Sequence, residues 1–149
     1  MRKTLLVGAL TLSAAVQPAF AAGDPVAGEA VFKKCIVCHS IGEGATNRVG
    51  PELNAVLGRV AGTAEGFKYS QGLIDAGAAG LVWTPETLVP WLHKPKDVIV
   101  GTKMSFVGLA DPVAIDNVIA YLATFSPDYV PAPAPSEAAP ASSASAPAN

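Results

Sequence analysis

The sequence predicts an all-α fold, a small helical domain whose helices are joined by long loops. Three Asp-Pro or Thr-Pro pairs, at residues 24–25, 84–85 and 111–112, place a capping side chain before a proline at a first helical position. Apolar residues near the end of the chain recur at the three-to-four-residue spacing of a buried helix stripe. The glycine-rich stretches between these places lack the strict alternation of a β-strand.

The first and last helices are the most clearly defined. The first is expected from Pro25 to about Lys34, directly before Cys35. The last is expected over residues 112–125, where it ends before Pro127. Its single buried stripe consists of Ile115, Val118, Ile119 and Leu122.

The middle helix is expected to begin at Pro85 and to be short or kinked. Pro90 lies inside it and removes one backbone donor. Its apolar residues are Leu88, Val89, Trp91 and Leu92. The glycine-rich connections on either side are long for so small a domain, and loops of that length are uncommon unless something organises them.

Both ends of the chain differ in composition from its middle. Residues 1–21 combine a basic start, an apolar run and a small-residue cleavage pattern, which predicts a secretory signal. The apolar run is shorter than the roughly 20 residues that a membrane-spanning helix needs. Residues 131–149 are almost entirely Ala, Pro and Ser and predict a disordered tail. The folded domain is therefore expected over residues 22–130, in the periplasm and not membrane-spanning after cleavage.

The charge balance excludes one class of function. Without residues 1–21 the chain has eight basic and twelve acidic residues, a net charge of −4, so it is not a nucleic-acid binder by charge. A domain of this length has a marginal hydrophobic core. A buried cofactor would supply additional stability.

Cys35 and Cys38 are the two cysteines of the sequence, and His39 follows the second directly. Two thiols at this spacing can bond the vinyl groups along one edge of a haem, which places the next residue's imidazole below the iron. The motif therefore predicts one haem c, attached covalently through both cysteines, with His39 as an iron ligand.

Three other uses of the motif stay open. A disulfide between Cys35 and Cys38 is compatible with an oxidising compartment. A thioredoxin-like dithiol has the same spacing, but it expects a preceding strand and a parallel sheet. A zinc ion would need a fourth ligand, for which His93 and scattered carboxylates are left. The export signal and the glycine-rich loops favour haem.

Met104 is the candidate for the opposite face of the iron. It is the one methionine left after the signal, and it lies in a loop, residues 100–106, between the second and third expected helices. A thioether is a soft, neutral ligand that favours ferrous iron. A methionine that merely fills the core is the alternative. His93 is a second candidate ligand, although its position beside Lys94 and Lys96 is more typical of a solvated loop residue.

Taken together, these residues resemble the class I c-type cytochromes, in particular the mitochondrial and the long-loop bacterial periplasmic members. The similarity extends from about Gly23 to Phe125. The segments that carry it, besides the cysteine motif, are 50–53, 57–59, 66–69, 101–106 and 120–122. The resemblance implies the cytochrome c fold, a helical domain wrapped around one covalently bound haem c.

The resemblance also implies roles for individual residues. His39 and Met104 would be the two iron ligands, and the Pro51 carbonyl would bind the free ring nitrogen of His39. Phe106 would pack beside the exposed haem edge. The residues that would hydrogen-bond the haem propionates are Arg59, Tyr69, Trp83 and Thr102. The family often has a tyrosine where this chain has Trp91, which donates a hydrogen bond but accepts none.

The implied function is one-electron transport, not enzymatic catalysis. With both axial positions filled, the iron has no open site for a substrate. A monomeric carrier would shuttle electrons between a quinol-oxidising complex and an oxidase or photosynthetic reaction centre, in respiration or photosynthesis. It would dock transiently on acidic redox partners through a basic ring. The ring consists of Lys33, Lys34, Lys68, Lys94, Lys96 and Lys103.

Two alternatives stay open at this point. Release of Met104 would free an iron site and make the protein a haem-based sensor or a weak peroxidase. Alternatively, the chain would be an electron-accepting subunit docked to one periplasmic dehydrogenase, with residues 131–149 as its tether.

Overall fold

The computed structural model describes residues 23–131. Within that range the regular secondary structure consists of helices joined by loops, with one isolated antiparallel bridge between Val60 and Val82, which confirms the all-α prediction. The helices, in chain order, are α1 (Pro25–Phe32), α2 (Gln71–Ala78), α3 (Pro85–His93), α4 (Pro95–Val98) and α5 (Pro112–Thr124). The expected signal, residues 1–21, and nearly all of the expected tail, 131–149, lie outside the described residues.

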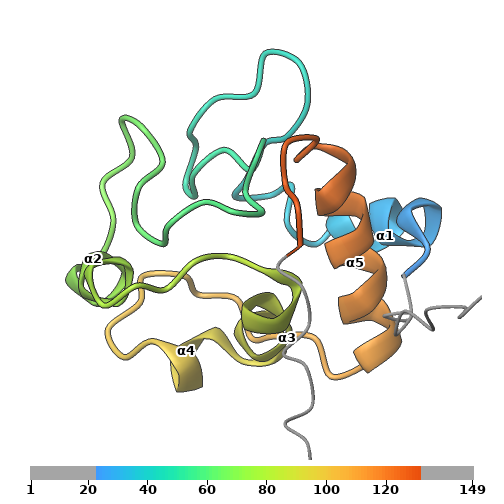
Figure 1. Ribbon diagram of the computed structural model, residues 1–149. Coiled ribbons are helices and arrows are strands. Elements are labelled where there is room, and N and C mark those ends of the chain that lie inside the picture. The colour runs from blue at the N-terminus through green and yellow to red at the C-terminus, as the bar shows by residue number, and fades with distance from the viewer. Residues whose placement is uncertain (1–22, 132–149) are drawn as a thin grey trace, which may run out of the picture.

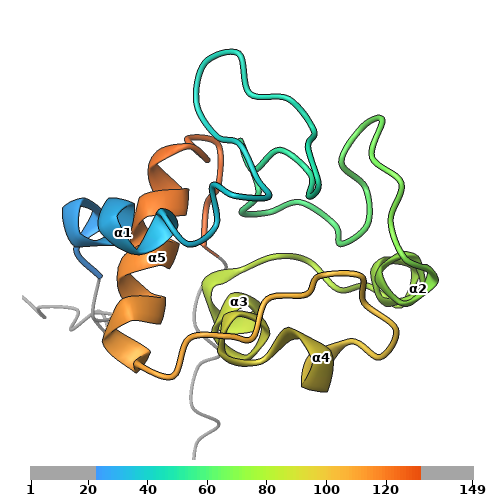
Figure 2. The same cartoon turned by 180° about the vertical axis from the view of Figure 1, so that it is seen from behind.

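Helices α1 and α5 cross each other at one end of the domain (Figures 1 and 2). Both start as the sequence predicts: Asp24 accepts a hydrogen bond from the Val26 N–H at 2.8 Å, and Asp111 accepts one from Val113 at 3.0 Å. The crossing is close because of Gly28, where a Cβ would collide with the Asn117 carbonyl. The stripe predicted for α5 is buried.

Helix α3 is short, as its internal proline predicts. The hydroxyl of Thr84 caps the helix by accepting from the Thr87 N–H at 3.3 Å, and the Thr87 hydroxyl in return accepts from Thr84 at 2.8 Å. Pro90 lies on the exposed side, where its missing donor can be tolerated. The inward face of α3 packs against α5 and consists of Leu88, Trp91 and Leu92.

The prediction of uninterrupted loops between the three helices was wrong for α2 and α4. Helix α2 contains two glycines, which weaken its helical pattern in the sequence. Both are needed for packing: a Cβ on Gly72 would collide with the Val100 carbonyl, and one on Gly77 with that of Ala61. Helix α4 is a single turn. α1 is also two residues shorter than expected, because hydrogen-bonded turns replace it after Phe32.

The remaining chain forms two walls that face each other. The long segment from the end of α1 to α2 lies on one side, and α3, α4 and the segment between α4 and α5 lie on the other (Figure 1). The buried core links both walls to the α1–α5 pair and includes Phe32, Leu57, Leu73, Trp83, Leu88, Trp91, Ile99, Leu109 and Val118. None of the helices between residues 23 and 131 has the length and apolarity needed to cross a membrane.

Candidate functional site

A cavity of about 450 Å³ lies between the two walls. Its lining is mostly apolar, and both walls contribute a few polar side chains, as is typical of a cofactor site. The structure brings all ten cofactor-binding residues expected from the sequence into this one lining: Cys35, Cys38, His39, Pro51, Arg59, Tyr69, Trp83, Thr102, Met104 and Phe106.

The cysteine motif forms the first wall of the cavity. The turns that follow α1 continue its helical hydrogen bonding: the N–H of Cys38 and that of His39 both donate to the Cys35 carbonyl, at 3.0 and 2.9 Å. The spacing of the two cysteines and the histidine is thus fixed by one short, hydrogen-bonded segment. That segment presents two thiols and an imidazole to the same cavity.

The imidazole of His39 is held in one orientation. Its Nδ1 lies 2.7 Å from the Pro51 carbonyl oxygen; with a proton on Nδ1, this nitrogen donates and Nε2 is left with its lone pair. Burial lowers the pKa of His39, which favours the neutral imidazole that binds metals. Gly50 makes room for the ring, because a Cβ at this position would collide with His39.

The structure weakens the alternatives for the cysteine motif. Cys35 and Cys38 are free thiols and form no disulfide. Burial raises the pKa of the Cys35 thiol to about 11 despite the opposing effect of Lys34, whereas a reactive dithiol needs a lowered pKa. Within residues 23–131 no three His, Cys, Asp or Glu side chains are grouped to hold a metal ion.

His93 lies apart from the cavity. The expectation that it is a loop residue was wrong, because it is the last residue of α3. It is exposed, as expected, and its Nδ1 lies 3.0 Å from the Leu109 carbonyl oxygen.

Met104 lines the opposite wall of the cavity and is half-buried against the core. Its backbone N–H donates to the Thr102 hydroxyl at 3.2 Å. Trp91 lies in the same lining, and its ring centroid is 5.2 Å from that of Trp83. The thioether therefore shares one cavity with the imidazole of His39.

The polar part of the lining has one buried hydroxyl without a partner. Ser70 is the residue before α2, but its hydroxyl does not cap the helix, and Ser70 Oγ has no hydrogen bond among the described residues. Because Ser70 lines the cavity, its hydroxyl is available to a polar group bound there. Sequence reasoning missed Ser70. The available signal was its position directly after Tyr69.

Tyr69 and Arg59 are partly engaged by the protein itself. The Tyr69 hydroxyl accepts from the Ala64 N–H at 3.3 Å, and burial raises its pKa, so it remains a donor. Arg59 donates to the carboxylate of Glu52 at 3.1 Å and to the Asn54 carbonyl at 3.0 Å. Together with Ser70, this end of the cavity offers hydroxyl and guanidinium donors. They fit the two carboxylates of a haem, while the thiols, imidazole and thioether fit its edge and its iron.

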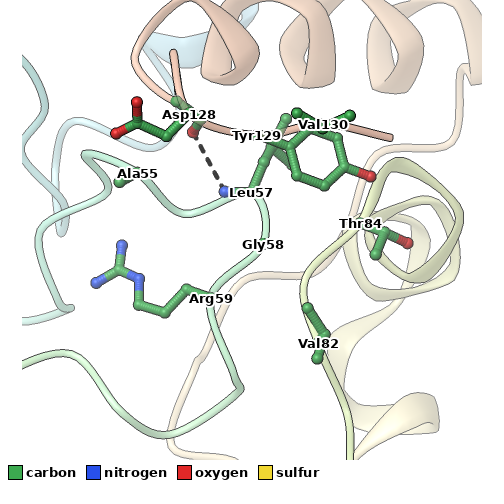
Figure 3. Close-up of a pocket in the computed structure, with 10 residues that line it drawn as sticks. Ala55, Leu57, Gly58, Arg59, Val82, Thr84, Asp128, Tyr129 and Val130 are labelled. Atoms are coloured by element: carbon green, nitrogen blue, oxygen red, sulfur yellow. Dashed lines mark hydrogen bonds between the residues drawn. The ribbon is translucent and has the colours of Figure 1, made fainter. Parts of the chain in front are cut away.

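The segment after α5 holds the loop that carries Arg59 (Figure 3). The dashed line at Leu57 in Figure 3 marks the hydrogen bond of 3.2 Å that the Leu57 N–H donates to the buried Ser126 hydroxyl. The same hydroxyl donates to the Leu122 carbonyl, also at 3.2 Å. Tyr129 packs beside Gly58, where an added Cβ would lie 3.3 Å from its ring. A second, more open pocket of about 610 Å³ lies between this segment and the loop.

The six lysines of the expected basic ring are all exposed, but they differ in position. Three of them, Lys34, Lys68 and Lys103, line the cavity, whereas Lys33, Lys94 and Lys96 do not. Lys94 pairs with Asp97 at 2.7 Å on the surface, which offsets its charge locally.

Comparison with known proteins agrees with this geometry, although no protein-family model matches the chain. Over 110 residues the chain is 50% identical to cytochrome c2 of Agrobacterium tumefaciens, an alignment that covers 74% of this chain and 98% of the relative. Over 129 residues it is 49% identical to cytochrome c2 of Blastochloris viridis, with 86% and 97% covered. The solved structure of cytochrome c2 from Rhodospirillum centenum matches with a TM-score of 0.67 and 45% identity, covering 70% of this chain and 100% of that one.

Proposed function

Because this chain belongs to the class I c-type cytochromes, we propose that it is a one-electron carrier between redox protein complexes. One observation carries the proposal: a Cys-x-x-Cys-His wall and a methionine wall enclose a single cavity. The names of the relatives give no support to a sensor, a peroxidase or a dehydrogenase subunit.

Haem c, held by thioether bonds to Cys35 and Cys38, supplies an iron that changes by one electron between its ferric and ferrous forms. His39 and Met104 would hold the iron from the two walls of the cavity, which would leave no position open for a substrate. The Pro51 carbonyl keeps the His39 ring oriented. Met104 favours the ferrous form and raises the reduction potential.

The walls of the cavity would keep the environment of the haem nearly unchanged between its ferric and ferrous forms. Phe106 is half-buried in the lining, and the exposed Lys34 and Lys103 line the same cavity. We propose that electrons enter and leave at this rim, where the lysines attract an acidic partner. The partners proposed are a quinol-oxidising complex as donor and an oxidase or photosynthetic reaction centre as acceptor, both reached from the periplasm after removal of the signal.

A redox titration with recorded visible spectra tests this function. The wild-type protein should show a reversible one-electron haem c couple and, when oxidised, the weak far-red absorption of a ferric iron–thioether bond. Met104→Ala should abolish that absorption and lower the potential. Ser105→Ala, an exposed neighbour, is the control and should change neither. A far-red band that survives in Met104→Ala would exclude Met104 as the ligand. Rapid carbon monoxide binding by the unmutated ferrous protein would count against a closed iron site.

A further inference from the structure

An ion pair lies in the polar end of the cavity wall. Arg59 Nη1 is 3.1 Å from Glu52 Oε1, and the two side chains are only 17% and 25% exposed. Arg59 lines the cavity. An ion pair with this degree of burial is screened less by salt and water than a surface pair, so its charges act over a longer range.

Hydrogen bonds hold both the carboxylate and the backbone of Glu52. Its second oxygen, Oε2, accepts from the Asn54 N–H at 2.8 Å, and the Glu52 N–H donates to the Asn47 side chain at 3.0 Å. Asn54 in turn exchanges two hydrogen bonds with the backbone of Gly42, at 2.8 and 2.9 Å. The negative charge therefore has a defined position and does not sample the solvent freely.

Arg59 is held in turn by Glu52 and Asn54. Nη1 donates to the Glu52 carboxylate, while Nη2 donates to the carbonyls of Glu52 and Asn54 at 3.1 and 3.0 Å. Three of its five N–H donors are thereby used. The arginine can still offer donors to a haem propionate, but its position and much of its charge are set by Glu52.

We propose that Glu52 is a positioning residue that sets the reduction potential of the haem by holding Arg59 and offsetting its positive charge. The inference rests on the proposed electron-carrier function. A ferric haem carries one more positive charge than a ferrous haem, so a nearby positive charge favours the ferrous form and a negative charge the ferric form. Glu52 therefore keeps the potential below the value that Arg59 alone would give.

A bridge that only fastens the loop around residues 52–59 is the competing explanation. It predicts a loss of stability when Glu52 is changed, but no systematic shift of the potential. Glu52→Gln preserves the size of the side chain, keeps one acceptor oxygen and removes the charge. Glu43→Gln makes the same charge change at an exposed position and is the matched control.

The test is the equilibrium of each haem-loaded variant with a reference redox couple at neutral pH. Glu52→Gln should move this equilibrium at least threefold toward the reduced protein, where tenfold corresponds to 59 mV for one electron. Glu43→Gln should move it less than 1.5-fold, an order-of-magnitude limit set by solvent screening. No shift in Glu52→Gln, a shift toward the oxidised protein, or an equal shift in Glu43→Gln would overturn the inference.

A second comparison covers the case in which Glu52→Gln does not accumulate as folded protein. Arg59→Gln leaves the carboxylate unbalanced and should move the equilibrium at least threefold toward the oxidised protein, an order-of-magnitude expectation for a partly buried charge. The double variant Glu52→Gln/Arg59→Gln should return toward the wild-type value. Equal potentials in Arg59→Gln and in the double variant would also overturn the inference. If the wild-type protein lacked a reversible haem c couple, the proposed function itself would fail. The wild-type measurement therefore separates that failure from a failure of the inference about Glu52.

Discussion

Replacing Gly50 by alanine should damage the histidine wall of the cavity. A Cβ at this position would lie 2.7 Å from His39 Nδ1 and 2.8 Å from Nε2. The backbone of Gly50 cannot retreat easily, because its N–H donates to the Cys38 carbonyl at 2.8 Å and its carbonyl accepts from Arg48 at 2.8 Å. The ring must therefore move instead, away from the Pro51 carbonyl, which lies 2.7 Å from Nδ1.

Two contributions give the expected magnitude for Gly50→Ala. Overpacking of a tight site costs about 1–3 kcal/mol, and loss of the hydrogen bond between His39 and Pro51 costs about 0.5–1.5 kcal/mol. We therefore expect the free energy of unfolding to fall by about 2–4 kcal/mol. With a guanidinium m-value near ~4 kcal/mol/M, the midpoint moves by about 0.5–1 M.

The assay is guanidinium unfolding of the haem-loaded ferric protein, followed by far-ultraviolet circular dichroism, with the visible spectrum recorded before unfolding. Gly44→Ala is the control: Gly44 has φ 71° and open space around the added Cβ. In Gly44→Ala the free energy of unfolding should fall only by the backbone strain that the alanine introduces, about 1–2 kcal/mol. The visible spectrum should remain that of the wild type. The reasoning is refuted if Gly50→Ala unfolds within about 0.5 kcal/mol of the wild type with an unchanged spectrum.

Two further predictions concern buried hydroxyls. Ser70→Ala should destabilise the haem-loaded protein by about 1.5–3 kcal/mol, because the hydrogen bond that its hydroxyl would donate to a charged propionate is removed; unfolding at the wild-type midpoint would mean that this hydroxyl has no partner in the loaded protein. Ser126→Ala leaves the Leu57 N–H unpaired and should also cost about 1–3 kcal/mol, lowering Tm in calorimetry by about 4–8 °C per kcal/mol. Thr124→Ala, which removes an exposed hydroxyl at the end of α5, should shift Tm much less, and equal shifts would contradict the role given to Ser126.

The sequence contained strong signals for the parts of the fold that depend on local chemistry. Helices α1, α3 and α5 each begin with a capping side chain and a proline, and these signals act within a few residues. Helix α2 was missed because its helical signal is weakened by Gly72 and Gly77. These glycines leave room for the backbone carbonyls of Val100 and Ala61, which lie far away in the sequence, so no local pattern indicates why glycine is needed.

The candidate site shows the same division. The haem-attachment motif at Cys35, Cys38 and His39 is contiguous, so its chemistry is visible in the sequence. The partner of Arg59 is not, because the pairing with Glu52 depends on the path of the loop between them. Ser70 was missed for a similar reason: only the folded chain reveals that its hydroxyl is buried and lacks a hydrogen bond to the protein.

The two walls of the cavity differ in how firmly the fold holds them, and this difference bears on the proposed function. The histidine wall is fixed by backbone hydrogen bonds around Cys38 and Gly50 and by the contact of the His39 ring with Pro51. Met104 is held by one hydrogen bond, from its N–H to Thr102 at 3.2 Å, and by partial burial. If Met104 is the iron ligand, as proposed, the iron–sulfur bond would therefore help to order this loop. In the proposed carrier, which exchanges one electron and no ligand, a closed iron site would depend on that contribution, so Met104 would decide between a carrier and an open haem site.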